Sequence, residues 1–404
     1  MASPDITSPE FKATAYAFYA ELRRNAPVFR AKLPDGQTAW LIARYDDVNR
    51  ALKDERIFKD KRKLSKRSGI TRLPGFLRSL EAIEGNMLDV DPPDHRRLRG
   101  LVHKAFTPRR VEEIAGRVER LADELLGKLS GEESVDLLRE YALPIPSTII
   151  SEMLGIPAGD QVRFHRWSSD IVAASAGKSL LHVLPSLLSL FRFIRYLKKV
   201  IARKSADPAD DLISALVEAE EQSDRLSRDE VLAMVFLLVV AGHETTVNLI
   251  GNGTLALLQN PRELERLRAE PALYPSAVEE LLRFYSPVEV ATERYASEPL
   301  EIAGVEIPAH ELVCPLLASA NRDESCFERG DELDVGRAPN PHLAFGDGIH
   351  FCLGAPLARL EGRIALEKLH GRFPDLGLAV PPDRLRWKRG LHLRGLEALP
   401  VSLS

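Results

Sequence analysis

The feature that most constrains the fold is a long apolar segment in the second half of the chain. Ser227 and Glu230 have the spacing of a capping box, in which each side chain hydrogen-bonds the backbone N–H of the other residue, so they mark a helix start. The helix can continue to about Leu258, because Asn260-Pro261 then stops it. At about 1.5 Å per residue it would be roughly 45 Å long, and its first half is apolar on every side. The sequence therefore predicts a buried helix long enough to cross the whole molecule.

A short polar patch interrupts this apolar segment at residues 241–246, Ala-Gly-His-Glu-Thr-Thr. Glycine weakens a helix, and threonine hydroxyls can bond to backbone carbonyls and open the helix locally. A carboxylate such as that of Glu244 is costly inside a buried helix unless it serves a function. We therefore interpret Glu244 and Thr245 as candidate catalytic residues, in preference to a stray polar patch near a helix end.

The second constraining feature is Cys352, which lies among the glycines of residues 345–354, Phe-Gly-Asp-Gly-Ile-His-Phe-Cys-Leu-Gly. Apolar residues recur at helical spacing over residues 355–366. The cysteine therefore precedes a helix start, where free N–H groups and the helix dipole stabilise a thiolate. The glycines allow a tight turn and the close approach of a flat cofactor. A buried thiolate needs a cation, and iron is the obvious one for a lone thiolate.

Three interpretations of Cys352 compete. A purely structural cysteine would leave the glycine spacing unexplained. A zinc site is disfavoured, because His342, His350 and Cys352 lack the spacing of paired ligands and no Cys-x-x-Cys motif is present. In the third interpretation, the pattern Phe-Gly-x-Gly-x-His-x-Cys-x-Gly resembles the haem-binding loop of the cytochrome P450 family.

This resemblance implies haem b as the cofactor, with the Cys352 thiolate as the axial ligand to its iron. It also implies a mainly α fold with small β regions, in which the long central helix crosses the haem. We expect one domain over residues 1–404, with β-rich parts near 26–45 and 297–320. The other loop residues expected to contact the haem are Phe345, Gly346 and His350.

Two further stretches resemble parts of the family that hold haem. Asp-Pro-Pro-Asp-His-x-x-x-Arg resembles the helix whose histidine and arginine, here His95 and Arg99, meet one haem propionate. An arginine fork suits a carboxylate bidentately. By the same resemblance, Arg294 is expected to meet the other propionate.

The polar patch at residues 241–246 resembles the oxygen-activation motif of the family. The resemblance implies that Thr245 helps to relay protons and that Glu244 belongs to the acid side of that relay. Ala241, together with Gly242, would leave space over the iron for dioxygen.

A second capping-box spacing, that of Ser276 and Glu279, predicts another helix start. Just beyond it, Glu280 and Arg283 lie three residues apart on one helix face. They resemble the Glu-x-x-Arg motif of the family. The resemblance implies a buried structural pair that holds the region of the cysteine loop.

As a whole, the resemblance implies a haem-thiolate monooxygenase that inserts one oxygen atom from O2 into an apolar small molecule, by C–H hydroxylation or epoxidation. Steroid, terpenoid, fatty acid and macrolide substrates all remain open. The alternatives are a peroxide-driven peroxygenase, which would lack the acid–threonine pair, and a non-enzymatic haem-thiolate sensor, which would need no oxygen-activation motif. The apolar residues expected to flank substrate are Met87, Leu88, Val239, Val240, Val288, Val290, Ala291 and Leu393.

We recognise no flavin or nicotinamide domain in the sequence. We therefore expect electrons from a separate ferredoxin-type partner that is served by an NAD(P)H-dependent reductase. A basic surface would attract an acidic ferredoxin. The residues expected to form it are Arg96, Arg97, Lys104, Arg109, Arg110, Arg359 and Arg363.

Composition disfavours several other classes of protein. A net charge of -4 provides no global basic field for nucleic acid. Three cysteines do not make a disulfide framework, which suits a reducing cytoplasm. We recognise no signal peptide, and the apolar runs at 231–242 and 180–197 fall short of a membrane span of about 20 apolar residues. We expect a cytoplasmic monomer without a membrane anchor, and we interpret the basic run at 59–72 as a solvated loop.

Overall fold

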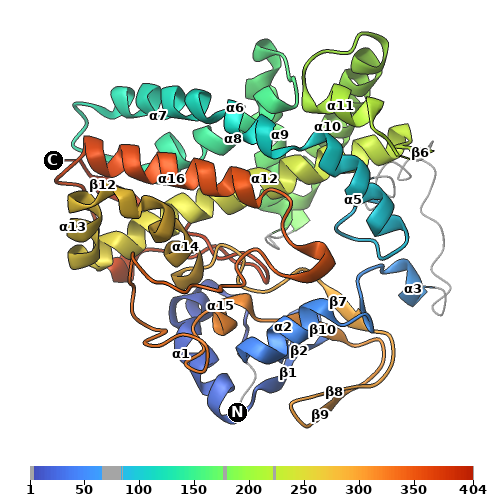
Figure 1. Ribbon diagram of the computed structural model, residues 1–404, viewed down its shortest axis with the longest axis vertical. Helices are drawn as coiled ribbons and strands as arrows, with labels where there is room; N and C mark the ends of the chain where they lie inside the picture. Colours follow the sequence, from blue (N-terminus) through green and yellow to red (C-terminus); the bar gives the residue numbers. More distant parts are fainter. Residues whose placement is uncertain (1–3, 66–82, 84, 176–179, 222–223, 404) are drawn as a thin grey trace. The chain divides into compact units, whose positions relative to one another are not determined.

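A computed structural model describes residues 4–65, 83, 85–175, 180–221 and 224–403. Contacts divide the chain into two compact units. Figure 1 labels the helices and strands of the chain. The larger unit comprises Met1–Phe58, Ile114–Ile145 and Thr245–Ser404, and the smaller unit comprises Lys59–Glu113 and Pro146–Glu244. The long helix α12 (Arg228–Gln259) contributes to both.

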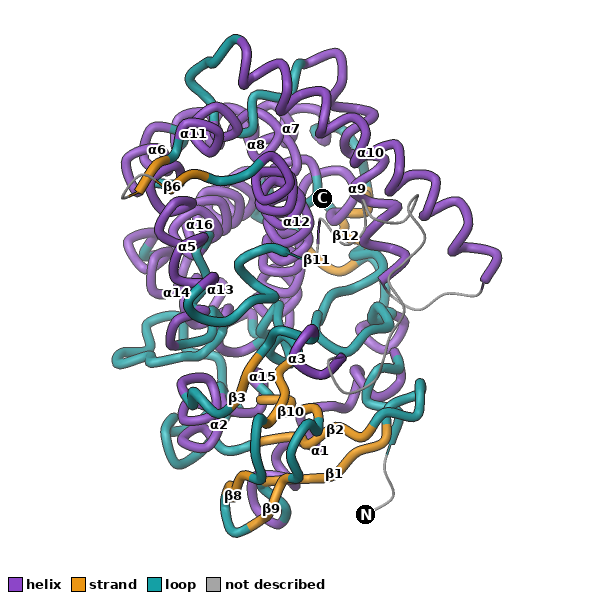
Figure 2. Tube along the Cα trace, turned by 90° about the vertical axis from the view of Figure 1, so that its right-hand side faces the viewer, coloured by secondary structure: helices purple, strands orange, loops and turns teal. Residues whose placement is uncertain are grey.

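The larger unit contains the main β-sheet, whose strands lie together in Figure 2. In sheet order they are β1 (Val28–Lys32), β2 (Thr38–Ile42), β10 (Leu312–Pro315), β7 (Arg294–Ala296) and β3 (Ile57–Phe58). Strands β1 and β2 form an antiparallel hairpin, and Gly36 in its turn has a φ of 87°, a conformation that favours glycine. The register pairs Val313 of β10 with Trp40 of β2 and with Arg294 of β7. Arg294 therefore lies on an inner strand.

An apolar core of the larger unit includes Leu249, Leu281 and Leu366, and the unit contains several helices besides its part of α12. They are α1 (Pro9–Asn25), α2 (Tyr45–Lys53), α7 (Ala115–Leu129), α13 (Pro261–Ala269), α14 (Tyr274–Phe284), α15 (Leu317–Ala320) and α16 (Ala355–Arg372). Short helical turns are η2 (Leu138–Ala142), η3 (Pro271–Leu273), η4 (Gly348–His350) and η5 (Pro382–Arg384). Helix α16 packs against α7 and α14. The remaining strands are β4 (Ser134–Asp136), β8 (Leu300–Ile302), β9 (Val305–Ile307), β11 (Gly377–Leu378) and β12 (Pro400–Ser402).

The smaller unit is helical apart from the short pair β5 (Glu220–Glu221) and β6 (Asp224–Arg225). It contains α3 (Arg62–Ser65), α5 (Asp94–Ala105), α6 (Pro108–Glu113), most of α8 (Pro144–Met153), α9 (Ala158–Ser175), α10 (Leu180–Ala206) and α11 (Leu212–Glu218). Helices α9 and α10 pack together through Phe164 and Phe193, whose ring centres are 5.2 Å apart. Within the basic run, Lys59 is buried and Lys63 pairs with Asp91, while residues 66–72 lie outside the described residues.

The predicted long helix is confirmed as α12, and its start is the predicted capping box. The backbone N–H of Ser227 donates to Glu230 Oε2 at 2.8 Å, and the N–H of Glu230 lies 3.2 Å from Ser227 Oγ. The helix is continuous through residues 241–246, so the polar patch does not open it. Within the part of the chain that is described, α12 alone is long and apolar enough to span a membrane, which differs from the prediction made from the run at 231–242. Just over half of its apolar window is buried.

Candidate active site

The cysteine loop is a compact turn in the larger unit, immediately before α16. Gly346 and Gly348 have φ values of 69° and 71°, which other residues rarely adopt. A Cβ on Gly348 would also lie 3.0 Å from the carbonyl oxygen of Leu52. The Cys352 N–H donates to the Phe345 carbonyl at 3.0 Å and closes the loop. These contacts explain why the pattern requires glycine on the N-terminal side of the cysteine.

Cys352 differs from the other two cysteines in exposure. It is exposed, whereas Cys314 is buried and Cys326 is half-buried. Burial raises the pKa of Cys314 to about 12, so that thiol stays protonated at neutral pH. Of the three cysteines, Cys352 is therefore the most accessible to a metal ion.

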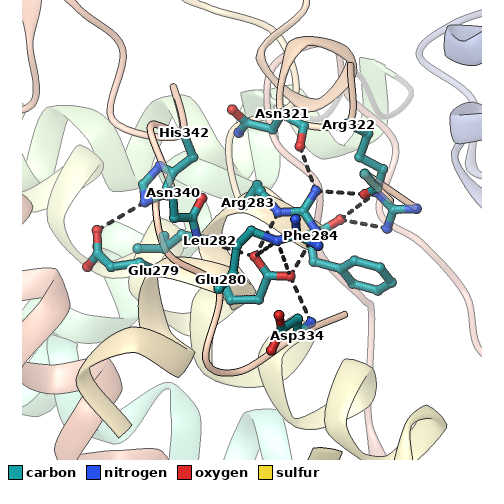
Figure 3. A network of polar contacts seen from close by, with 12 residues as sticks. Glu279, Glu280, Leu282, Arg283, Phe284, Asn321, Arg322, Asp334, Asn340 and His342 are labelled. Atoms are coloured by element: carbon teal, nitrogen blue, oxygen red, sulfur yellow. Dashed lines mark hydrogen bonds and ion pairs between the residues drawn. The ribbon is translucent and has the colours of Figure 1, made fainter. Parts of the chain in front are cut away.

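A fully buried ion pair supports the segment that leads into this loop (Figure 3). Glu280 and Arg283 form two hydrogen bonds, with Nε–Oε2 and Nη2–Oε1 distances of 2.7 and 2.8 Å. Arg283 also donates to the carbonyls of Asn321 and Gly330 at 2.8 and 2.7 Å. The side chain of Asn321 in turn accepts the backbone N–H of Leu343 at 2.7 Å. The predicted pair thus fixes backbone just before the cysteine loop.

A second carboxylate, that of Glu279, anchors both sides of the loop. It binds His342 Nε2 at 3.0 Å and Arg359 Nε at 2.7 Å. The guanidinium of Arg359 also lies 4.5 Å from the ring centre of Phe345. Burial alone would raise the pKa of Glu279, but the hydrogen bonds from His342 and Arg359 lower it to about 2.

This role of Glu279 differs from the sequence-based prediction. Helix α14 begins at Tyr274, so Ser276 lies inside the helix, and its hydroxyl donates to the carbonyls of Leu273 and Val335. The Ser276–Glu279 spacing therefore does not form a capping box. The sequence did contain one signal, because two adjacent acids on a largely buried helix each need a cationic partner.

Arg294 on β7 is a buried cation. Its Nη1 donates to the Thr292 carbonyl at 2.7 Å, and burial lowers the pKa of its guanidinium to about 10. Across the described residues, no carboxylate forms an ion pair with it. A buried charge without an acidic partner is costly. The position therefore suits an anionic group such as a haem propionate.

In the smaller unit, helix α5 carries His95 and Arg99 one turn apart. His95 is 2 % exposed. Burial, reinforced by the positive charge of Arg99, lowers the pKa of His95 to about 4. The imidazole is therefore neutral at pH 7 and lies close to a guanidinium. Both groups can donate hydrogen bonds to a carboxylate.

The set of metal donors fits haem. The described residues contain no group of three or more histidine, cysteine, aspartate or glutamate side chains that could hold a metal ion. Cys352 alone suits a cofactor that brings the metal's other ligands with it. The cationic positions at Arg294 and at His95 with Arg99 suit the carboxylates of such a cofactor.

The polar patch of α12 is partly accessible. Ala241 is exposed, and Gly242, Glu244 and Thr245 are half-buried. His243 is buried, and its Nδ1 lies 2.9 Å from the Val239 carbonyl, so this imidazole contacts the backbone of its own helix. The patch therefore presents a carboxyl and a hydroxyl on adjacent residues, as an acid–threonine pair requires.

The residues expected to flank substrate are divided between the two units. Residues 288–291 and Leu393 lie side by side in the larger unit, where Val288 and Leu393 form an isolated β-bridge. Val288 and Leu393 are half-buried, and Val290 and Ala291 are buried. In the smaller unit the remaining candidates are Met87, Leu88, Val239 and Val240.

Most residues of the expected basic surface are neutralised by carboxylates. Five of the seven form ion pairs: Arg97 with Glu230, Arg109 with Glu113, Arg110 with Asp210, Arg359 with Glu279 and Arg363 with Glu367. The two others are Arg96 and Lys104. The surface that includes these residues and their carboxylate partners is therefore less positive than the basic residues alone would make it. Arg359 contacts Glu279 and so belongs to the support of the cysteine loop.

Comparisons with known proteins agree with the site. The Cytochrome P450 family matches residues 9–374. The chain is 48% identical over 388 residues to "Cytochrome P450 107B1" of Saccharopolyspora erythraea, covering 95% of this chain and 93% of that protein. It is 41% identical over 412 residues to "6-deoxyerythronolide B hydroxylase" of the same organism, covering 99% and 98%.

A solved structure extends the agreement to the fold. The cytochrome P450 PksS of the Bacillus subtilis 168 bacillaene polyketide synthase superposes with a TM-score of 0.90 at 43% identity, covering 98% of each chain. The predicted mainly α fold is confirmed. The chain belongs to the cytochrome P450 family, whose members bind haem through a cysteine thiolate.

Proposed function

We propose that this protein inserts one oxygen atom from O2 into an apolar small molecule, by C–H hydroxylation or epoxidation. The observation that carries the proposal is the cysteine loop, in which an exposed Cys352 follows two glycines with positive φ and precedes α16. The adjacent Glu244 and Thr245 on α12 favour monooxygenation over the two alternatives, because a peroxygenase or a sensor has no need of an acid–threonine pair.

The Cys352 thiolate would bind the haem iron, and the cationic residues would hold the haem carboxylates. Arg294 would bind one propionate, and His95 with Arg99 would bind the other. Phe345, Gly346, His350 and Ala241 would contact the macrocycle. When bound, thiolate-ligated haem supplies the activation of dioxygen.

The polypeptide supplies protons, orientation and a dry pocket. The Thr245 hydroxyl would hold a proton at the point of oxygen activation, and the Glu244 carboxyl would pass a proton to it. Apolar side chains would exclude water from the reacting carbon. Those we propose to flank substrate are Met87, Leu88, Val239, Val240, Val288, Val290, Ala291 and Leu393.

For the substrate we propose a polyketide-derived macrocycle. One similar protein is named for a macrolactone, the 6-deoxyerythronolide B hydroxylase, and another, PksS, is named for a polyketide synthase. The apolar wall proposed above suits such a molecule, whose surface is largely hydrocarbon. Steroids, terpenoids and fatty acids are the competing classes.

The first experiment is the carbon monoxide difference spectrum of the reduced protein, with Cys352→Ser as the control. A strongly red-shifted Soret band that is lost in the control is expected. A histidine-type spectrum in the wild type would refute thiolate ligation. Spin-state titrations with 6-deoxyerythronolide B, testosterone and myristic acid then rank the substrate classes, and the macrolactone should give the lowest Kd. A lower Kd for either of the other compounds would refute the macrocycle assignment.

We also propose a separate ferredoxin and an NAD(P)H-dependent reductase as the electron source, and a cytoplasmic monomer that folds as one domain. Replacing Arg109 and Arg110 together by Glu should slow reduction by a ferredoxin at low salt, and added salt should reduce the difference. Equal reduction rates for the variant and the wild type at low salt would reject this docking surface. Because both arginines already pair with acids, an effect of less than about tenfold is expected.

A further inference from the structure

Three buried charges come together where helix α1 contacts two irregular segments of the larger unit. The side chains of Lys12, Glu289 and Arg394 are 0%, 1% and 2% exposed. Lys12 Nζ lies 2.5 Å from Glu289 Oε2, and Arg394 Nη1 lies 3.3 Å from Glu289 Oε1. Taking charges out of water is costly, and well-packed apolar side chains are often as stable. Stability alone therefore does not explain the cluster.

The ammonium of Lys12 also holds backbone. Its Nζ donates to the Leu393 carbonyl at 2.8 Å, while Arg394 Nη1 donates back to the Lys12 carbonyl at 2.7 Å. The hydroxyl of Tyr19, on the same helix, also helps to lower the pKa of Glu289. Burial alone would raise the pKa of Glu289, but the positive charges of Lys12 and Arg394 lower it below its ordinary value. Lys12 thus binds both the Glu289 carboxylate and the Leu393 carbonyl, which belong to segments distant from each other in the chain.

These two segments pair with each other through few hydrogen bonds. The N–H groups of Glu289 and Val290 both point to the His392 carbonyl, at 2.7 and 3.3 Å, and the Arg394 N–H donates to the Pro287 carbonyl at 2.9 Å. Val288 and Leu393 form an isolated bridge rather than part of a named strand. Such a short ladder specifies its register weakly, so a side chain bonded to both segments can fix it.

We propose that Lys12 is a positioning residue for substrate: from helix α1 it fixes the register and separation of the segments at 287–290 and 392–394, and so determines which substrates and which carbon atoms the protein selects. The proposal rests on the proposed function, because Val288, Val290 and Leu393 matter in this way only if they flank substrate. The Lys12 side chain is fully buried and would act on substrate only through these two segments.

The test is Lys12→Met. Methionine keeps most of the buried volume but removes the donor to Leu393. It leaves Glu289 and Arg394 as a balanced pair, so the variant should fold and bind haem. Spin-state titrations with testosterone, myristic acid and 6-deoxyerythronolide B should show a change of at least threefold in the ratio of two Kd values. With the probe that shows turnover, the ratio of products should shift while kcat changes less than twofold.

Arg23→Met is the matched control. Arg23 is also buried on α1, and it pairs with Glu324 and the Ser319 carbonyl rather than with a residue of either substrate segment. It should keep the wild-type Kd ratios whatever it does to thermal stability. Lys12→Gln keeps an N–H donor without the charge and should fall between Lys12→Met and the wild type. Such a graded response would not follow from loss of packing alone.

Two results would overturn the proposal. One is an unchanged set of Kd and product ratios in a haem-loaded Lys12→Met protein. The other is loss of haem from both Lys12 variants while Arg23→Met keeps it, which would make Lys12 structural only. Neither result touches the proposed function, which instead fails if the wild type itself lacks a thiolate-type carbon monoxide spectrum.

Discussion

Arg359 on α16 and Glu279 on α14 form an ion pair with two hydrogen bonds, Nε–Oε1 at 2.7 Å and Nη2–Oε2 at 2.8 Å. His342 binds the same carboxylate from the other side of the cysteine loop, at 3.0 Å. A single carboxylate therefore restrains the chain both before and after Cys352. This arrangement gives the loop a dependence on pH that can be measured.

The first prediction concerns stability in acid. The pKa of Glu279 falls from 4.5 to about 2 on folding, so its ion pair contributes stability above about pH 4.5 and loses it as the pH falls towards 2. We expect about 1–2 kcal/mol of the free energy of unfolding to be lost between pH 5 and pH 3 through this group. Urea unfolding of Glu279→Gln should show a shallower loss. The control is Glu367→Gln, whose partner Arg363 is 3.5 Å away on the surface of α16. Parallel pH profiles for Glu279→Gln and the wild type would reject the role of this ion pair.

The second prediction concerns the opposite pH range. Glu361 is buried on α16, and burial raises its pKa to about 8 although the Thr246 hydroxyl beside it lowers it in part. The folded protein keeps this proton where the unfolded chain has lost it, so stability falls as the pH rises from about 4.5 to about 8. Between pH 5 and pH 7 the expected loss is about 2 kcal/mol. Glu361→Gln should remove that slope, whereas Glu367→Gln should retain it. A slope in Glu361→Gln equal to that of the wild type would show that another group is responsible.

The third prediction concerns the buried pair of α14. Glu280→Ala leaves the Arg283 and Arg337 guanidiniums without their shared carboxylate, and breaking a buried pair costs about 3–5 kcal/mol. The variant should yield little haem-loaded protein by its carbon monoxide spectrum. Glu265→Ala, at an exposed position on α13, should behave as the wild type. Normal haem content together with a normal unfolding temperature in Glu280→Ala would contradict the supporting role.

The fourth prediction concerns Thr245. Its replacement by Ala should leave NAD(P)H consumption largely intact but divert the electrons to hydrogen peroxide, because the proton donor at the oxygen-activation point is lost. We expect product formed per NAD(P)H to fall by about tenfold or more. Thr254→Ala is the matched control, since that hydroxyl is on the same helix and bonds the Ile250 carbonyl at 2.8 Å. Full coupling in Thr245→Ala would disprove the proton-relay role.

The sequence predicted the features whose causes are local. The capping box of Ser227 and Glu230 involves residues three apart, and the structure contains both of its hydrogen bonds. The glycines before Cys352 could be interpreted from the sequence because positive φ favours glycine, and Gly346 and Gly348 both have positive φ. The i, i+3 pair of Glu280 and Arg283 is likewise local.

The sequence could not predict partners that the fold brings together from distant segments. Nothing in the N-terminal residues indicates that Lys12 binds a glutamate 277 positions later. Arg359 was expected on a docking surface. Its carboxylate partner on α14 lies 80 positions away in the chain, so the sequence did not reveal the ion pair. The ion pair of Arg110 with Asp210 also joins segments that are distant in the chain, so the sequence did not reveal it. Long-range ion pairs depend on tertiary packing, which leaves no periodic signal in either partner.

The position of Lys12 has a consequence for synthesis on the ribosome. Lys12 in helix α1 is synthesised well before Leu393, whose carbonyl its ammonium binds and which lies 381 positions further on. At translation rates of about 5–20 residues per second, roughly 20–80 s separate the two ends of this one contact. Throughout that interval Lys12 lacks the carbonyl that its ammonium binds in the folded protein. Helix α1 therefore completes its buried contacts long after its own synthesis, and a chaperone acting during translation would be expected to hold it.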